Sequence, residues 1–335
     1  MQKKRVAVIC GSSGSEASIS RKSGEMVLQS LSVELWEAYL IEWTSEQWIA
    51  QDREGNTYRV NPGNFTIDIN GISQHFDVVF NAMHGPPGED GTVAGYLQML
   101  GIPQTSCDHY TAALCFNKRD CLRQLRSLGI PTARHFELDL GDSIDSRAIV
   151  EKVGLPCFVK ANRSGSSFGV YKVYTLEDLT PAIQKALEED TQVIIEEALE
   201  GREVSVGVIS WKGEVRMLPI TEIVSQNDFF DYAAKYEGLS EEITPAKLPE
   251  AWEKNIEKTS IQIYKHLNLQ GLSRSEFILR DGIPHLLEVN TIPGLTPESI
   301  LPQQAQAAGI SVEELFNNAL QEALKQHPFT KKPQI

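Results

Sequence analysis

The chain has 335 residues, too many for one ordinary hydrophobic core and enough for two or three domains. Hydrophobic residues make up 41% and charged residues 23%, which is ordinary for a soluble globular protein. The net charge of −14 argues against nucleic acids and anionic membranes as partners, so a small anionic ligand would need a local cluster of lysines and arginines.

The five cysteines are odd in number, spread along the chain and free of C-x-x-C spacing. This pattern predicts reduced thiols rather than a disulfide framework or a zinc site. The apolar run Val6 to Cys10 is too short for the core of a signal peptide, and no run approaches the ~20 apolar residues of a membrane helix. We therefore expect a cytoplasmic protein with no membrane partner.

The first element is expected to be a buried strand over 5–10, which runs into a Gly/Ser loop and a helix over about 19–31. This order is typical of the first βα unit of a parallel sheet. The loop lacks G-x-G-x-x-G, so a dinucleotide site is not indicated. Residues 34–70 are interpreted as an irregular insertion at the edge of the domain, with short strands at 57–60 and 65–69.

A second buried strand is predicted over 76–81, followed by a loop rich in glycine and proline and a helix over 91–100. Open α/β sheets bind ligands at the carboxyl ends of their strands, where this loop lies. His84 in the loop has two interpretations: a ligand contact, or a histidine held by backbone carbonyls at a loop corner. The N-terminal domain is expected to span residues 1–117.

An amphipathic helix over 118–128 begins the second unit. A strand then delivers Lys160 directly before the Gly/Ser-rich segment 162–169. Such a loop offers backbone N–H groups and hydroxyls to a phosphate, although the P-loop pattern G-x-x-x-x-G-K-[ST] is absent. A hairpin tip without function is the alternative, and the lysine beside the loop favours phosphate binding.

Acidic residues follow the last strand of this unit, which is predicted over 192–199 after a helix over 176–188. They can accept hydrogen bonds from ribose hydroxyls or an adenine amine, although such acids more often carry solvated surface charge. The central domain is expected to span 118–199 and the C-terminal domain 200–335. The segment 227–236 mixes aromatic and polar residues and is interpreted as a long loop over a site.

The stretch around Asp281-Gly282 predicts a β-hairpin, because two apolar runs flank this turn signal. Side chains alternate along a strand, so Arg274 and Glu276 share one face of the first strand. Glu288 and Asn290 likewise share one face of the second strand.

The length of the hairpin loop decides which residues face each other. A two-residue loop would pair Glu276 with Leu287 and turn the two acids to opposite faces. A three-residue loop over 281–283 would pair Glu276 with Glu288. We predict this second register, because three-residue loops with a glycine are common.

Two carboxylates that face each other across a strand pair repel, so a positive charge must lie between them or one must be protonated. Carboxylate and carboxamide oxygens suit Mg²⁺ or Mn²⁺, which would take further ligands from water and nucleotide phosphates. A surface hairpin with scattered charges is the alternative. The Pro293-Gly294 turn counts against it, because this turn exposes backbone N–H groups beside the acids.

Five short segments occur in a specific order along the chain. They are His84-Gly85 with Gly88-Glu89-Asp90-Gly91; Val159-Lys160 with Gly165-Ser166-Ser167-x-Gly169; Phe230-Asp231-Tyr232 with Ala234-Lys235-Tyr236; Arg274-x-Glu276; and Leu287-Glu288-Val289-Asn290-Thr291-x-Pro293-Gly294-x-Thr296. Together they resemble the D-alanine–D-alanine ligase family of ATP-grasp enzymes over nearly the whole chain. The resemblance implies an α/β ATP-grasp fold of three domains, with ATP held between the central and C-terminal ones.

The resemblance also implies the reaction, the ligation of two D-alanines for peptidoglycan precursors. The carboxylate of the first D-alanine would attack the γ-phosphate of ATP, and the amine of the second would displace phosphate from the acyl phosphate. Two Mg²⁺ or Mn²⁺ ions would bind Glu276, Glu288 and Asn290. The residues implied to bind ATP are Lys118, Lys160, Ser166, Ser167, Glu196, Glu197, Leu199, Glu203 and Lys235.

The resemblance names the groups that would touch the reacting amino acids. Arg274 and the Gly294 N–H would stabilise a tetrahedral oxyanion. The implied catalytic set is completed by Glu16, Ser166 and Tyr236, and the implied substrate contacts are His84, Ser18, Ser299 and Gly294. A homodimer is the family expectation.

Two residues depart from the family pattern. The first loop usually carries a second glutamate that holds the first substrate's ammonium, and Ser18 stands in its place. Either Glu16 or another acid binds the ammonium in place of the missing glutamate, or recognition of the first amino acid is looser. Glu276 replaces the usual metal-binding aspartate and keeps its charge. Tyr236 favours an amine as the attacking group, because relatives that make D-alanyl-D-lactate differ there.

The rival interpretations are an ATP-grasp ligase for a different acid and a non-catalytic nucleotide-binding module.

Overall fold

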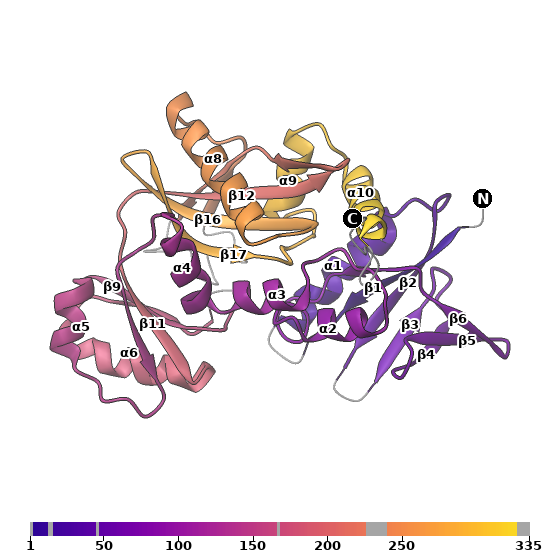
Figure 1. The fold of residues 1–335 in the computed structure, drawn as a ribbon, viewed down its shortest axis with the longest axis horizontal. Helices are drawn as coiled ribbons and strands as arrows, with labels where there is room; N and C mark the ends of the chain where they lie inside the picture. The colour runs from indigo at the N-terminus through magenta and orange to yellow at the C-terminus, as the bar shows by residue number, and fades with distance from the viewer. Residues whose placement is uncertain (1–2, 13–15, 45–46, 166–167, 226–239, 327–335) are drawn as a thin grey trace, which may run out of the picture.

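The computed structural model describes residues 3–12, 16–44, 47–165, 168–225 and 240–326. Within these ranges the strands form three sheets, which meet at a common junction (Figure 1). The N-terminal sheet lies at the right of that view, a second sheet at the lower left, and the C-terminal sheet above them. Over the described residues, no helix is long and apolar enough to cross a membrane.

The N-terminal sheet has a parallel core and an antiparallel extension, in the order β6-β5-β4-β3-β2-β1-β7. β1 (Lys4–Cys10) pairs in parallel with β2 (Trp36–Trp43) and β7 (Val78–Asn81). α1 (Ala17–Ser30) packs against β1 and β2. The antiparallel strands are β3 (Trp48–Gln51), β4 (Thr57–Asn61), β5 (Thr66–Ile69) and β6 (Ile72–His75).

The prediction of an irregular insertion over 34–70 is wrong for its first part, whereas its two predicted short strands are present as β4 and β5. β2 is the parallel neighbour of β1 and is buried over most of its length. Its two glutamates concealed the strand pattern. Glu37 pairs with Arg5 at 3.1 Å, Glu42 pairs with Arg21 at 3.0 Å, and the two glutamate side chains are 40% and 39% exposed, so neither charge is buried.

The second sheet is antiparallel, in the order β10-β9-β11-β8, and helices cover one of its faces (Figure 1). α5 and α6 pack on that face around Val159 and Ile195. Because side chains alternate along the strands, Lys160 and Glu196 point to the other face. The elements are β8 (His135–Asp139), α5 (Ser146–Val153), β9 (Cys157–Ala161), β10 (Val170–Val173), α6 (Leu176–Glu189) and β11 (Gln192–Glu197).

The C-terminal sheet has the order β15-β14-β12-β16-β17, and β13 pairs with the end of β12. Its strands are antiparallel neighbours throughout. The strands are β12 (Arg202–Trp211), β13 (Glu214–Met217), β14 (Thr221–Ser225), β15 (Ser240–Ile243), β16 (Leu272–Arg280) and β17 (Ile283–Asn290). The helices of this part are α8 (Glu250–His266), α9 (Ile300–Ala307) and α10 (Val312–Lys325).

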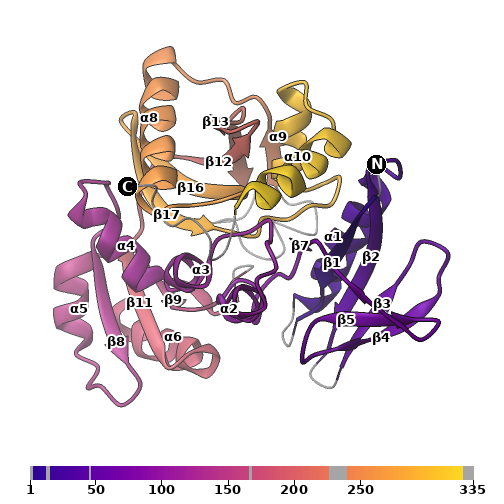
Figure 2. The ribbon, with the colours of Figure 1, turned by 45° about the vertical axis from the view of Figure 1, so that its right-hand side comes forward.

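Three helices run along the junction of the sheets: α2 (Thr92–Met99), α3 (His109–Phe116) and α4 (Lys118–Ser127). Figure 2 shows them following one another across the middle of the molecule. α3 and α4 pack against β17. On the other side, α10 packs against β7, where the rings of Phe80 and Phe316 lie 5.3 Å apart. Helices thus pack against strands of both the N-terminal and the C-terminal sheet at this junction.

The hairpin has the predicted pairing but reaches it by another route. β16 and β17 are joined by the two-residue loop Asp281-Gly282, in which φ is 52° and 79°. Two successive positive φ angles are typical of the type I′ hairpin turn. Glu276 still faces Glu288, because Leu287 is an extra residue that forms a β-bulge. The predicted three-residue loop is wrong, and the predicted facing of the two acids is confirmed.

Candidate active site

Two clefts meet at the junction of the three sheets. The wide cleft has a volume of about 520 Å³ and lies between the C-terminal sheet and the face of the second sheet that is opposite α5 and α6. The narrow cleft has a volume of about 110 Å³ and lies between loops of the N-terminal sheet and the end of the β16–β17 hairpin. Both are lined by Lys118, Ser164, Gly165 and Glu288, so they share one boundary.

Cations of the chain itself neutralise the two facing acids of the hairpin. The Arg274 guanidinium pairs with Glu276 and also donates to the Ser205 hydroxyl at 3.0 Å. The Lys118 ammonium lies 3.3 Å from the Glu288 carboxylate. Burial disfavours the charge of Arg274, but Glu276 and Glu288 outweigh burial and raise its pKa. The positive charge that the facing acids require is thus supplied by an arginine and a lysine.

The oxygen atoms of this hairpin also fit a hard cation. Glu276 and Glu288 face each other, and Asn290 lies two residues beyond Glu288 on the same face. Asn290 Oδ1 accepts the Ile292 N–H at 2.9 Å, which uses one of its two lone pairs. Across the described ranges, no group of three or more Asp, Glu, His or Cys side chains forms a metal site by itself. An ion here would need ligands from water or phosphate, as Mg²⁺ commonly does.

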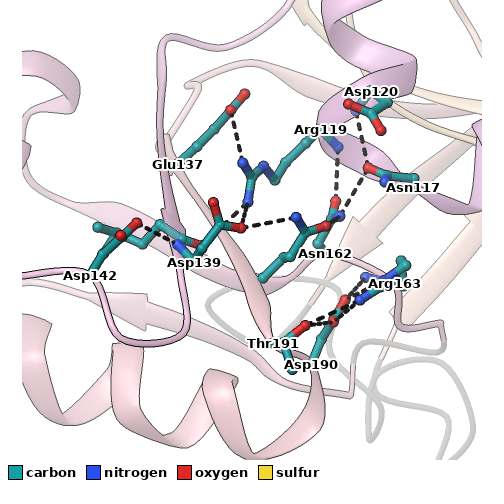
Figure 3. A network of polar contacts seen from close by, with 12 residues as sticks. Asn117, Arg119, Asp120, Glu137, Asp139, Asp142, Asn162, Arg163, Asp190 and Thr191 are labelled. Carbon is teal, nitrogen blue, oxygen red and sulfur yellow. Dashed lines mark hydrogen bonds and ion pairs between the residues drawn. The ribbon is translucent and has the colours of Figure 1, made fainter.

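A buried asparagine fixes the start of α4 to the loop after β9 (Figure 3). Asn162 is fully buried, accepts the Arg119 N–H at 2.9 Å and donates to Asn117 Oδ1 at 2.9 Å. Asn117 is the N-cap of α4. Lys118 follows it directly, and its ammonium donates to the Ser164 carbonyl at 2.6 Å. Lys118 therefore reaches the boundary of the clefts from a fixed backbone.

Lys160 and Glu196 form a buried ion pair on the floor of the wide cleft. Their charged atoms are 2.7 Å apart, and their side chains are 15% and 3% exposed. Burial opposes the charge of Lys160, but Glu196 and, more weakly, two further glutamates outweigh burial and raise its pKa. Within the described residues, Glu196 Oε1 is buried and has no hydrogen-bond partner. Because a buried acceptor without a donor is costly, a ligand donor here would stabilise the site.

The narrow cleft holds two acids besides Glu288, which it shares with the wide cleft. Glu16 lies at the start of α1, and a methyl group added to Gly85 or Gly165 would come within 2.8 or 3.0 Å of its carboxylate. Glycine at both positions lets the two loops approach the Glu16 carboxylate closely. Glu89 is 8% exposed and accepts the Gly85 N–H at 3.2 Å. Burial, and then the charge of Glu16, raise the pKa of Glu89 well above its usual range.

Known families account for nearly all of this chain. The family models described as D-ala D-ala ligase N-terminus and D-ala D-ala ligase C-terminus match residues 5–107 and 124–321. The chain belongs to the D-alanine–D-alanine ligase family. A D-alanine–D-alanine ligase of Flavobacterium johnsoniae is 50% identical over 321 residues, which cover 96% of this chain and 99% of that relative.

Solved structures share the fold. The D-alanyl-alanine synthetase A of Vibrio cholerae has a TM-score of 0.86 and 29% identity, over 97% of this chain and 100% of that one. A D-alanine–D-alanine ligase of Bacillus anthracis, solved in complex with ATP, has a TM-score of 0.79 and 29% identity, over 97% and 98%. The predicted family, the ATP-grasp fold and the enzyme class, an ATP-dependent ligase, are thereby confirmed.

In this member of the D-alanine–D-alanine ligase family, the predicted ATP contacts gather in the wide cleft. Lys118, Lys160, Glu196, Glu197, Leu199 and Glu203 all line it. Glu197 is already engaged, because its Oε1 accepts the Arg134 N–H at 2.9 Å and its Oε2 accepts Arg134 Nε at 2.7 Å. A ligand contact through this carboxylate would share its remaining lone pairs with Arg134. The predicted contacts Ser166, Ser167 and Lys235 lie outside the described residues.

The predicted substrate contacts are divided. His84 and Gly294 line the narrow cleft, whereas Ser18 and Ser299 line neither of the two clefts. Ser18 is exposed on α1. Ser299 lies beside Gly294, and its hydroxyl accepts the Thr296 N–H at 3.2 Å. The fold thus keeps Ser299 near the narrow cleft and leaves Ser18 outside it.

The predicted catalytic groups within the described ranges reach the narrow cleft together. Glu16, Arg274 and Gly294 line it, from the N-terminal loop, β16 and the segment after β17. Ser166 and Tyr236 lie outside the described residues. Three separate parts of the chain therefore converge where the resemblance places the reacting atoms.

Sequence reasoning missed three polar side chains that hold or flank the predicted ones. Ser205 contacts Arg274, Ser23 contacts His84, and Glu89 lies beside Glu16 in the narrow cleft. Ser205 stands between two valines of β12, and a polar residue inside an apolar strand is a usable signal. Ser23 has no such signal, because α1 contains several serines and only packing decides which is buried.

Proposed function

We propose that the two clefts together carry out the family's reaction, the ATP-dependent ligation of two D-alanines. ATP would occupy the wide cleft, with its base near Leu199 and its phosphates near Lys160 and Lys118. The two amino acids would occupy the narrow cleft. The observation that carries this proposal is the shared boundary, because Lys118 and Glu288 line both clefts. A γ-phosphate bound there could be reached by a carboxylate from the narrow side.

The buried ion pair of the wide cleft supports its assignment to a nucleotide. Glu196 Oε1 lacks a donor within the described residues, and an adenine amine or a ribose hydroxyl would supply one. Glu203 lines the same cleft and is the second proposed acceptor for ribose hydroxyls. Glu197 lines the same cleft, and its carboxylate would accept from the nucleotide beside its contacts with Arg134.

Divalent cations are part of the proposal. Glu276, Glu288 and Asn290 would hold two Mg²⁺ or Mn²⁺ ions, because their oxygens share one face of the hairpin. Bound there, such ions neutralise charge on a polyphosphate and on the transferred phosphoryl group. Arg274 and Lys118 would then give up part of their contact with the two glutamates and turn their charges to substrate oxygens.

The first D-alanine would place its ammonium at Glu16 and its carboxylate at the boundary. Glu16 is one of the candidates for the ammonium partner and lies in the narrow cleft, whereas Ser18 is exposed, which supports Glu16 in this role. The carboxylate oxygen attacks the γ-phosphorus, and the bond to ADP breaks. Both reactants are anions, so Lys118 and Lys160 lower the repulsion between them.

The amine of the second D-alanine then attacks the carbonyl of the acyl phosphate. Arg274 and the Gly294 N–H would stabilise the tetrahedral oxyanion before phosphate leaves. Because water would hydrolyse the acyl phosphate, the site must close over it. The proposed closing and contact residues are Ser166, Ser167, Lys235, Tyr236 and Ser299, as the resemblance implies.

The wider organisation is also proposed. Residues 1–117, 118–199 and 200–335 would be the three domains of the ATP-grasp enzyme. All five cysteines are free and buried, which suits the reducing cytoplasm in which ATP is available. A homodimer follows from the family resemblance and would be tested by light scattering.

The experiment that tests this function is phosphate release from ATP with different amino acids. D-alanine should release phosphate in step with D-alanyl-D-alanine, and L-alanine should release little. D-lactate as the second substrate should be poor, since Tyr236 favours an amine. Phosphate release that requires another acid and not D-alanine would favour an ATP-grasp ligase of different specificity.

A further inference from the structure

His84 has both ring nitrogens engaged by the chain itself. The ring follows β7, is 5% exposed and lines the narrow cleft. Its Nδ1 lies 2.9 Å from the Ile292 carbonyl oxygen, 208 residues along the chain. Its Nε2 lies 2.8 Å from Ser23 Oγ on α1. The interpretation of a histidine held by backbone carbonyls therefore fits Nδ1, whereas a serine side chain contacts Nε2.

The partners of the ring determine where the protons lie. A carbonyl oxygen only accepts hydrogen bonds, so Nδ1 carries the proton and the neutral ring leaves Nε2 as an acceptor. The Ser23 hydroxyl then donates to Nε2, and its oxygen accepts the Leu295 N–H at 3.4 Å. Burial lowers the pKa of His84 and outweighs the opposing charge of Glu16, so the neutral ring is favoured.

These hydrogen bonds hold the segment that carries Gly294. The side chains of Ile292 and Leu295 are 2% and 1% exposed, and they anchor the segment on either side. Gly294 lies between them and lines the narrow cleft. Within the described part of the chain, its N–H makes no hydrogen bond. The segment thus presents an available donor from a backbone that is held at both ends.

We propose that His84 and Ser23 are positioning residues that hold the Gly294 N–H for the oxyanion and do not touch the substrate. This inference rests on the proposed role of Gly294. A donor to an oxyanion must already be in place when charge develops, and a displacement of about 1 Å can lower the rate ~10²-fold. Two side chains of the N-terminal part would therefore set the geometry of a catalytic group that follows β17.

The test uses Ser23→Ala, His84→Asn and the double variant. The asparagine amide can still donate to the Ile292 carbonyl but does not extend to Ser23. Each single change should lower kcat about tenfold and leave the KM values for ATP and D-alanine within about twofold of the parent. The double variant should be no slower than His84→Asn alone, because both changes break the same series of hydrogen bonds.

Thr111→Val is the matched control. It removes a buried hydroxyl that donates to the Leu267 carbonyl at 3.2 Å, across 156 residues and away from both clefts. Its kcat should equal that of the parent. A similar loss of kcat in this control would assign the effect of Ser23→Ala to general destabilisation and overturn the proposal.

A different pattern would identify His84 as a substrate contact. In that case His84→Asn would raise the KM for D-alanine, and Ser23→Ala would behave like the parent.

Nitrogen NMR of the ring gives a readout that does not depend on turnover. A proton on Nδ1 of a neutral ring in the parent supports the proposal, and a proton on Nε2 or a charged ring near neutral pH overturns it. If the neutral ring carries its proton on Nδ1 but the chain shows no D-alanine-dependent phosphate release, only the proposed function is contradicted.

Discussion

The two clefts of this ligase are built in opposite ways. The floor and rim of the wide cleft are ion pairs, Lys160 with Glu196 at 2.7 Å and Arg202 with Glu222 at 2.6 Å. The narrow cleft also contains charged side chains, but the segment that carries Gly294 is held there by hydrogen bonds of the neutral groups Ser23 and His84. Arg274 combines both principles, because it lines the narrow cleft, pairs with Glu276 of the wide cleft and donates to the Ser205 hydroxyl.

This difference corresponds to what each cleft is proposed to bind. A nucleotide must enter and leave in every turnover, and charged side chains on long stems can exchange a carboxylate for a phosphate. A tetrahedral oxyanion is short-lived, and it is stabilised by hydrogen-bond donors that are already in place when it forms. The comparison teaches that exchangeable charge and fixed backbone are separate requirements, which this chain meets with different parts of its fold.

Removing the cation that faces the hairpin acids should have the largest effect, because Arg274 lines the narrow cleft and pairs with Glu276 of the wide cleft. Arg274→Ala should lower kcat by about 10²–10³-fold, or about 3–4 kcal/mol of transition-state stabilisation. The KM for ATP should change little, since Lys160 and Lys118 remain. Phosphate release and peptide formation measure both quantities. A near-normal kcat in Arg274→Ala would break the comparison, because Arg274 would then have no catalytic role. Arg274→Lys is the control for charge without the guanidinium geometry.

A change confined to the narrow cleft should sharpen the comparison. Glu16→Gln should raise the KM for the first D-alanine by about tenfold, since a hydrogen bond between charged groups contributes about 1.5–3 kcal/mol. The KM for ATP should stay unchanged, because Glu16 does not line the wide cleft. Ser18→Ala is the matched control and should have no effect, because Ser18 is exposed. A raised KM in Ser18→Ala instead would restore the serine as the recognition residue.

The smallest effect is expected for the Asp190–Arg163 ion pair, which lies outside both clefts. Asp190 accepts hydrogen bonds from the Arg163 backbone and guanidinium at 2.6–3.0 Å, beside the loop that follows β9 (Figure 3). Burial alone would raise the pKa of Asp190, but these bonds outweigh it and lower the pKa. A lowered folded-state pKa means that the stabilisation is present above the unfolded value of about 4 and is lost as the pH falls through the folded one.

Asp190→Asn should therefore lower the free energy of unfolding by about 1 kcal/mol at neutral pH, since Arg163 is partly exposed. The difference from the parent should shrink below about pH 4. Urea unfolding at several pH values measures this. A difference that does not depend on pH would mean that the ion pair contributes nothing to stability.

The hairpin illustrates how a prediction can be right for the wrong reason. The alternation of apolar and polar residues identified both strands, and Asp281-Gly282 identified the turn. The pairing of Glu276 with Glu288 arises from the bulge at Leu287 and not from a longer loop. A bulge inserts one residue into one strand, and its position depends on packing around the pair that it interrupts.

The missed strand β2 has a similar explanation. A parallel strand inside a sheet is expected to be apolar throughout, and β2 contains two glutamates. Their partners Arg5 and Arg21 come from β1 and α1, which precede β2 in the chain and lie beside it only after folding. The pattern of a single segment cannot reveal an acid that a neighbouring element will neutralise.

The sequence by itself determined the family, the ATP-grasp fold and the identity of the hairpin acids, because ordered motifs and alternation are local properties of the chain. Only the tertiary structure decided that Arg274 and Lys118 neutralise those acids, that Arg134 holds Glu197, and that Ser23 and His84 hold the segment after β17. Apart from the Arg274–Glu276 pair, whose members are two residues apart, each of these contacts joins distant parts of the chain. Charge and hydrogen-bond partners act over a few ångströms in space, and sequence distance carries no information about which groups come that close.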